Sequence, residues 1–232
     1  MHVPDGFLDA PTSVATAAVA AVAVTAALRG ARRELDDRTA PLAGLVATFV
    51  FAAQMVNFPV GAGTSGHLMG GTLAAALVGP WTATLCLTVV LLVQALLFAD
   101  GGLTALGTNV TLMGVIGVWI GYAVLRLVGL ALRRRPGSVP LAAGLGGFTS
   151  VVVTAVAFAG LFAIGGRAPV DPATLAAAMA GVHAFIGIGE GVLTALVVGS
   201  VLAVRPDLVH ATRRGSRRLR EHAAAADQGR AR

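Results

Sequence analysis

The sequence predicts an all-α, polytopic membrane protein of about seven transmembrane helices. Hydrophobic residues make up 56% of the 232 residues and charged residues 12%, whereas an average soluble domain has roughly 25% charged residues. The apolar residues are gathered into runs, and about 20 residues are enough to cross a bilayer as a helix. All 17 basic residues are arginine, and most of them lie between alternate runs or after the last one.

The apolar runs predict the helices in chain order. The first follows a leader that carries Asp5 and Asp9 and no basic residue, which is the reverse of the charge order of a cleavable signal, so we expect this helix to be retained. The predicted helices span residues 11–29, 40–57, 68–79, 81–99, 108–132, 139–164 and 172–204.

The arginines predict the orientation of these helices. Arg29, Arg32, Arg33 and Arg38 follow the first run, Arg133, Arg134 and Arg135 the fifth, and the residues from Arg205 onward the seventh, whereas the opposite loops carry only Arg167. Cytoplasmic loops are enriched in basic residues, which places the N-terminus outside and the C-terminus in the cytoplasm of a plasma-membrane protein. We expect residues 1–204 to form the membrane domain and residues 205–232 a flexible, Arg-rich cytoplasmic tail that contacts anionic lipid rather than nucleic acid.

The third run is too short to span the membrane. Its 12 residues reach roughly 18 Å as a helix, against a hydrocarbon core of about 30 Å. The preceding NFPVGAGTSGH contains Pro59 and three glycines, which predicts irregular re-entrant chain and places His67 at the floor of an outward-opening pocket. Similar interruptions are expected in FADGGLTALGTN and near IGIGEG, and they bring Asp100, Asn109 and Glu190 to the outer half of the membrane.

The N-terminus carries a candidate metal chelate. The α-amine of Met1 and the backbone nitrogen of His2 can close a five-membered ring around a metal, and that nitrogen and Nδ1 of His2 close a six-membered ring. Loss of the amide proton is promoted by Ni²⁺, Cu²⁺ and, less readily, Co²⁺, and a planar set of nitrogens suits Ni²⁺ or Cu²⁺. His67 is the candidate for the fourth ligand. We expect Met1 to be retained because histidine, the next residue, is large.

Other polar residues are candidates for a shell that orients the metal-bound histidines: Asp5, Thr64, Ser65, Asp100, Asn109 and Glu190. Two of them have competing interpretations, Asp100 as a loop carboxylate in solvent and Asn109 as an N-cap of the fifth helix. His183 and Glu190 share one face of the seventh helix. We interpret that pair as part of a structural hydrogen bond between helices, with an intramembrane metalloenzyme as the alternative.

Several functions are disfavoured by composition. A Walker-type phosphate loop needs a lysine, and the chain has none, so ATP hydrolysis is expected in partner subunits rather than here. The single cysteine, Cys86, excludes an intrachain disulfide and a thiolate cluster. No organic cofactor is expected.

Four motifs resemble one known family. MHVPDGF at the start, NFPVGAGTSGHLMGG at 57–71, QALLFADGGLTALGTNV at 94–110 and HAFIGIGEGVLTA at 183–195 are similar to the signatures of CbiM or NikM, the substrate-binding components of energy-coupling factor transporters for cobalt and nickel. The resemblance implies a six-helix core with an extra N-terminal helix, and a metal held by the Met1 amine, the His2 backbone nitrogen, His2 Nδ1 and His67. It also implies a transmembrane coupling subunit, two ATPase subunits and, in many members, a small accessory membrane subunit.

The residues and the resemblance together predict a component of an ATP-driven importer that binds Co²⁺ or Ni²⁺ outside the cell and delivers it inward, for cobalamin biosynthesis or nickel enzymes. The planar ligand set favours nickel, whereas the link of such signatures to cobalamin favours cobalt. A structural or lipid-interacting membrane protein without metal is a third possibility.

Overall fold

Five helical segments are long and apolar enough to cross a membrane in the computed structural model, which describes residues 1–37, 39–61, 64–132, 135 and 137–212. They are α1 (Ala10–Ala31), α4 (Pro80–Leu97), the continuous path Leu106–Ala131, α7 (Ser138–Gly165) and α8 (Pro172–Val204). Two shorter helices, α2 (Thr39–Gln54) and α3 (Gly71–Val78), complete the predicted set, and a 3₁₀ turn (Pro206–Leu208) follows α8. The prediction of an all-α polytopic membrane protein is confirmed.

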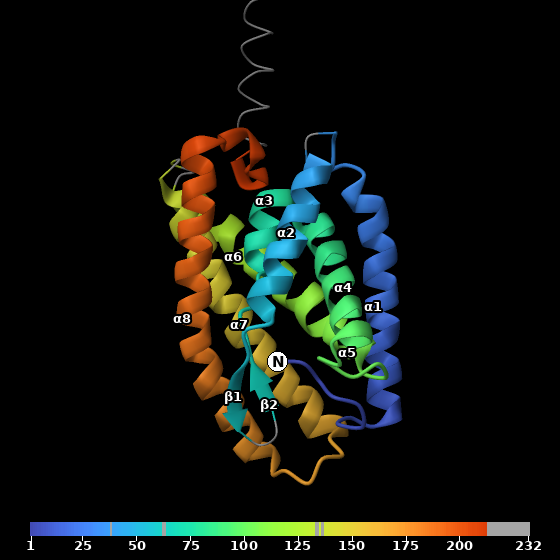
Figure 1. The fold of residues 1–232 in the computed structure, drawn as a ribbon. Coiled ribbons are helices and arrows are strands. Elements are labelled where there is room, and N and C mark those ends of the chain that lie inside the picture. Colours follow the sequence, from blue (N-terminus) through green and yellow to red (C-terminus); the bar gives the residue numbers. More distant parts are fainter. Residues whose placement is uncertain (38, 62–63, 133–134, 136, 213–232) are drawn as a thin grey trace, which may run out of the picture.

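The helices pack around the short helix α3. All eight residues of α3 are buried, and it contacts α2, α4, α6, α7 and α8. Figure 1 shows α1 and α8 on opposite sides of the bundle with α3 between them. A helix of eight residues rises only about 12 Å, so the third run, as predicted, does not span the membrane by itself.

The segment before α3 differs from the prediction of irregular chain. Residues Phe58–Gly61 (β1) and Thr64–Gly66 (β2) pair antiparallel, with Phe58 opposite Gly66 and an irregular register between Pro59 and Gly61. The hairpin lies against α8. A hydrogen-bonded ladder satisfies the backbone polar groups of a segment that is too rich in glycine and proline for a helix.

The predicted interruption near IGIGEG is wrong, because α8 is one continuous helix through it. Its glycines serve a close crossing with α7 instead. A Cβ on Gly191 would lie 2.8 Å from the carbonyl oxygen of Gly144, and a Cβ on Gly187 would lie 3.1 Å from Phe148. Small residues at such positions let two membrane helices approach closely.

The fifth run also differs in detail from the prediction. It begins as a short helix, α5 (Leu106–Asn109), continues as a π-helix (Val110–Gly117) and ends as α6 (Val118–Ala131). Hydropathy carries no signal that separates a π-helix from an α-helix. Such segments are rare and are frequently found at functional sites.

The arginines gather at one end of the bundle. Arg29, Arg32 and Arg33 lie at the end of α1, Arg135 in the connection from α6 to α7, and Arg205 after α8, whereas Arg167 lies in the α7–α8 connection at the other end. Arg38, Arg133, Arg134 and residues 213–232, the main part of the predicted tail, lie outside the described residues.

Candidate metal site

The leader folds back into the bundle and places the N-terminus inside it (Figure 1). Val3 is fully buried and is held through its backbone. Its N–H donates to Oδ1 of Asn109 at 2.8 Å, and its carbonyl accepts from Nδ2 of Asn109 at 3.2 Å and from the N–H of Gly102 at 2.9 Å. These three hydrogen bonds hold Met1 and His2 in the interior.

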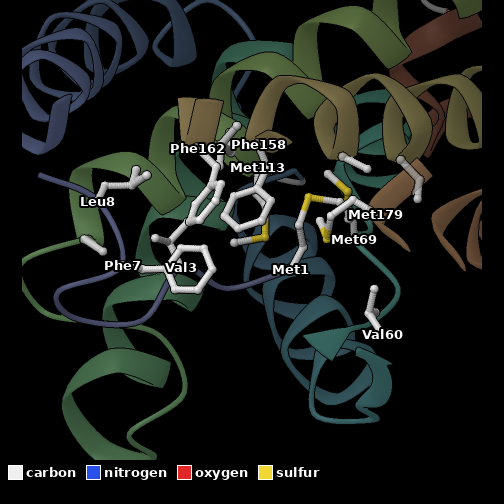
Figure 2. Packing of buried hydrophobic residues seen from close by; sticks show 14 of the residues in the cluster. Met1, Val3, Phe7, Leu8, Val60, Met69, Met113, Phe158, Phe162 and Met179 are labelled. Carbon is white, nitrogen blue, oxygen red and sulfur yellow. The ribbon is translucent and has the colours of Figure 1, made fainter. Parts of the chain in front are cut away.

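Met1 lies in an apolar pocket. Its side chain is 1% exposed and lies in one cluster with Met69, Met113 and Met179 (Figure 2). Burial lowers the pKa of its α-amine from 8.0 to about 4, although the charge of Asp100 opposes the shift. The amine is therefore uncharged at neutral pH, and its lone pair is available to a metal.

The His2 ring lies between two polar side chains of the α4 end. Its Nε2 is 3.2 Å from Oε1 of Gln94, and its Nδ1 is 3.1 Å from Oδ1 of Asp100. Gln94 was not predicted from the sequence as a residue of the site. Its signal was available, since a polar amide within the apolar LLVQALL costs free energy in a membrane helix unless it has a partner.

His67 presents one free ring nitrogen. Its Nδ1 lies 2.8 Å from the carbonyl oxygen of Leu68, which places the proton on Nδ1, and its buried Nε2 has no hydrogen-bond partner among the described residues. Its ring stacks on that of His2 with centroids 4.5 Å apart. Burial lowers the pKa of His67 well below its usual value. The ring is neutral, and Nε2 can act as a ligand.

Glu190 fixes the segment that follows His67. Its carboxylate accepts hydrogen bonds from the backbone N–H groups of Met69 at 2.9 Å and Gly70 at 2.8 Å, immediately before α3. Gln54 of α2, also missed from the sequence, donates to the carbonyl of Met69 at 2.8 Å. Glu190 thus makes a structural contact between α8 and the segment that joins His67 to α3.

His183 resembles His67 in its hydrogen bonding. Its Nδ1 lies 2.9 Å from the carbonyl oxygen of Met179 in its own helix, and its buried Nε2 has no hydrogen-bond partner among the described residues. A Cβ on Gly66 would lie 3.2 Å from that Nε2. His183 therefore faces the hairpin strand that leads to His67.

Two of the remaining candidate residues contact the leader, and three do not contact the two histidines by hydrogen bond. Asp100, with a side chain 18% exposed, lies 3.1 Å from Nδ1 of His2, so the structure favours its interpretation as a neighbour of the histidines over that of a loop carboxylate in solvent. The N-cap interpretation of Asn109 is wrong, because the helical path begins earlier, at Leu106, and the Asn109 side chain makes no cap hydrogen bond but holds Val3. Asp5 is exposed and accepts from Thr104, Thr64 donates to the sulfur of Met179 at 3.7 Å, and Ser65 lies in β2 opposite Pro59.

The structure therefore brings together a neutral amine, two imidazoles and the Asp100 carboxylate. Within the described residues, side chains of His, Cys, Asp and Glu form no group of three or more that could hold a metal ion. The site combines nitrogen donors from the main chain with nitrogen donors from side chains, and such a set suits transition metals rather than Mg²⁺ or Ca²⁺.

Comparisons with known proteins show which family the chain resembles. Residues 2–208 match the CbiM family, described as the cobalt uptake substrate-specific transmembrane region. The chain is 40% identical to a putative metal transport protein of Haloquadratum walsbyi, over 90% of this chain and 93% of that protein. It is 38% identical to the cobalt transport protein CbiM of Sorangium cellulosum, over 90% and 94% of the two chains.

The chain is also similar to a nickel transport protein and to a solved structure. The fused nickel transport protein NikMN of Rhodobacter capsulatus is 36% identical over 90% of this chain and 64% of that protein. A crystal structure of a transition metal transporter superposes with a TM-score of 0.82 at 33% identity, covering 95% of this chain and 100% of the other. Given a family match across residues 2–208 and a shared fold, the chain belongs to the CbiM family of substrate-specific transmembrane proteins.

Proposed function

We propose that the chain is the metal-binding component of an ATP-driven importer of Ni²⁺ or Co²⁺. The metal would be held by the Met1 α-amine, the His2 backbone nitrogen, His2 Nδ1 and His67 Nε2. The observation that carries this proposal is the stacking of His2 on His67 in the interior of the bundle, where the Met1 amine is also buried. The chain is a transport component and not an enzyme, in line with relatives that are named metal transport proteins.

The hydrogen bonds around the two imidazoles support ligation. A metal-bound histidine normally gives its second ring nitrogen to a protein oxygen, which fixes the ring. Gln94 Oε1 is in place for Nε2 of His2, and the Leu68 carbonyl holds Nδ1 of His67. Binding would move His2 Nδ1 from Asp100 to the metal, and the partly exposed carboxylate would attract the incoming cation.

Other subunits would supply the energy and the coupling. The chain contains no lysine and hence no Walker-type phosphate loop. The family resemblance implies two ATPase subunits, a transmembrane coupling subunit and an accessory membrane subunit. A bundle whose ligands are fixed and buried would release the metal by reorientation or by movement of the leader.

Selective modification of the terminal amine tests the proposal. Because the sequence has no lysine, the α-amine of Met1 is the primary amine that an acetylating ester modifies, and mass spectrometry can verify a single added group. We expect the purified, acetylated chain to keep its helical circular dichroism and to lose Ni²⁺ and Co²⁺ binding in calorimetry. Unchanged binding by the acetylated chain would refute the proposed ligand set, and competition between the two ions on the unmodified chain would rank nickel against cobalt.

A further inference from the structure

Four of the five methionines of the sequence lie in one buried cluster, and a histidine with a free ring nitrogen adjoins it. We propose that the thioethers of Met1, Met69 and Met179 and the imidazole of His183 form a second metal site, which binds a soft monovalent cation, Cu⁺ or Ag⁺. Met1 enters the proposed Ni²⁺ ligand set only through its amine, and the other three residues do not enter it. The soft site therefore goes beyond the proposed function and does not depend on it.

The methionine side chains come from separate parts of the fold. Met1 belongs to the leader, Met69 to the segment before α3, Met113 to the π-helix and Met179 to α8. Met1 is 1% exposed and the others are fully buried. Figure 2 shows the side chains of Met1, Met69 and Met179 directed toward one another within the cluster. Packing of the bundle thus gathers thioethers that are far apart in the sequence.

His183 adds a nitrogen donor beside Met179. It lies one helical turn further along α8, and its Nδ1 is 2.9 Å from the carbonyl oxygen of Met179, so the ring is turned back toward that residue. The same contact places the proton on Nδ1 and leaves a lone pair on Nε2. His183 is fully buried, and its Nε2 has no hydrogen-bond partner among the described residues. A buried polar atom of this kind is costly in a membrane helix unless something binds to it.

Strand β2 shows that His183 and Met179 face the same side. Residues two apart on a strand point to one face, and here they are Thr64 and Gly66. Oγ1 of Thr64 lies 3.7 Å from the sulfur of Met179, and a Cβ on Gly66 would lie 3.2 Å from Nε2 of His183. A side chain at position 66 would therefore cover Nε2, whereas glycine leaves it uncovered.

The donor atoms determine which ion fits. Thioethers are soft ligands that favour Cu⁺, and imidazole also suits copper. A thioether and a neutral imidazole carry no charge, so the bound ion keeps its full charge in the interior. Because the cost of burying an ion rises with the square of its charge, such a site favours a monovalent over a divalent cation.

Met1 joins the soft site to the proposed Ni²⁺ site. Its amine belongs to one and its thioether to the other, so two bound cations would be separated by about the length of one side chain. Like charges repel strongly at such a distance in a buried environment. We expect bound Ag⁺ to weaken Ni²⁺ binding by about tenfold, and Ni²⁺ to weaken Ag⁺ binding by the same factor. This coupling, unlike the soft site itself, rests on the proposed function.

Silver is the probe for the test. Ag⁺ prefers the same soft ligands as Cu⁺ and is not oxidised by air. Every chain in the experiment carries Cys86→Ser, which removes the free thiol as a competing ligand and keeps a donor for the carbonyl of Ala43. Calorimetry on the purified full-length chain in chloride-free detergent solution measures the Ag⁺ affinity.

Three substitutions identify the ligands. Met179→Leu and His183→Leu roughly conserve volume and remove one donor each. We expect each to weaken Ag⁺ binding by about tenfold or more, because losing a ligand costs more than losing its hydrogen-bond partner. Both should bind Ni²⁺ as tightly as the Cys86→Ser chain does. Met55→Leu is the matched control, because Met55 is exposed after α2 with its sulfur 4.0 Å from Nε2 of Gln94, and its Ag⁺ affinity should be unchanged.

The outcomes separate the soft site from the proposed function. If the Cys86→Ser chain does not bind Ag⁺, or if Met55→Leu loses as much Ag⁺ affinity as Met179→Leu and His183→Leu, the soft site is wrong and the proposed function survives. If Ag⁺ binds as expected but neither Ni²⁺ nor Co²⁺ does, the proposed function fails and the soft site stands. Thermal unfolding without metal, followed by circular dichroism, shows that each variant is folded.

Discussion

The imidazole rings of His2 and His67 stack with their centroids 4.5 Å apart and their planes inclined by 26°. One ring belongs to the leader and the other to the connection between the hairpin and α3. Neither segment is a spanning helix, yet both rings are buried at the centre of a helical bundle. Each ring has one nitrogen close to a protein oxygen, Gln94 for His2 and the Leu68 carbonyl for His67.

Removal of the His67 imidazole should abolish metal binding without unfolding the chain. His67→Leu puts a side chain of similar size in a fully buried position but removes Nε2. We expect Ni²⁺ affinity to fall by more than the roughly 10- to 100-fold caused by losing a hydrogen-bond partner of a metal ligand. His183→Leu is the matched control, since it removes an equally buried imidazole with the same bond to a carbonyl. Calorimetry measures the Ni²⁺ affinity of both purified variants. An equal loss of affinity in His67→Leu and His183→Leu would contradict the assignment of His67 alone as the ligand.

Loss of the Glu190 carboxylate should destabilise the fold and weaken metal binding together. Glu190→Leu would leave the buried N–H groups of Met69 and Gly70 without an acceptor, at about 1–3 kcal/mol for each. Glu190→Gln keeps one acceptor oxygen and should lose roughly half as much. Thermal unfolding in detergent without metal measures the stability. A Glu190→Leu chain as stable as the native one would show that the two N–H groups find other partners.

The stability of the docked leader should fall with pH between about 8 and 4. Burial lowers the pKa of the Met1 amine to about 4, so in this window the docked amine stays neutral while the undocked or unfolded amine takes up a proton. The unfolded state then binds more protons, and stability falls by at most about 1.4 kcal/mol per pH unit as pH decreases. Above pH 8 the amine is neutral in both the docked and the undocked state, so the docked leader has its full stability. The N-acetylated chain has no such group, so parallel pH profiles of thermal unfolding for the two forms would contradict the prediction.

Two glycines of α7 should respond in opposite ways to alanine. A Cβ on Gly146 would lie 2.5 Å from the carbonyl oxygen of Gly121 in α6, whereas a Cβ on Gly160 has nothing within 4 Å. Gly146→Ala must push two helices apart, and we expect a loss of about 1–3 kcal/mol. Gly160→Ala should be neutral or gain up to about 1 kcal/mol from helix propensity. Thermal unfolding of the two variants side by side is the measurement, and similar melting temperatures would contradict close packing of α6 on α7.

The sequence predicted the membrane class, the number of helical runs and the short third helix, because hydropathy and segment length are local properties that the bilayer constrains directly. It also singled out Met1 and His2, because chelate rings depend on covalent spacing within a few residues, and His67, because a glycine- and proline-rich stretch precedes a helix too short to span the membrane. It wrongly predicted a break in α8, since a run of glycines has the same local signature whether it interrupts a helix or lets another helix pack closely. The pairing and register of the β1–β2 hairpin were not predicted from the sequence either.

Only the tertiary structure decided what the other polar residues do. Asn109 contacts Val3, Gln94 and Asp100 contact His2, and Glu190 contacts Met69 and Gly70. Each of these contacts joins residues far apart in the chain, and each depends on how helices rotate and cross. Composition and periodicity describe one segment at a time, so they showed that these side chains needed partners in a membrane. Packing of the whole bundle determined which partners they found.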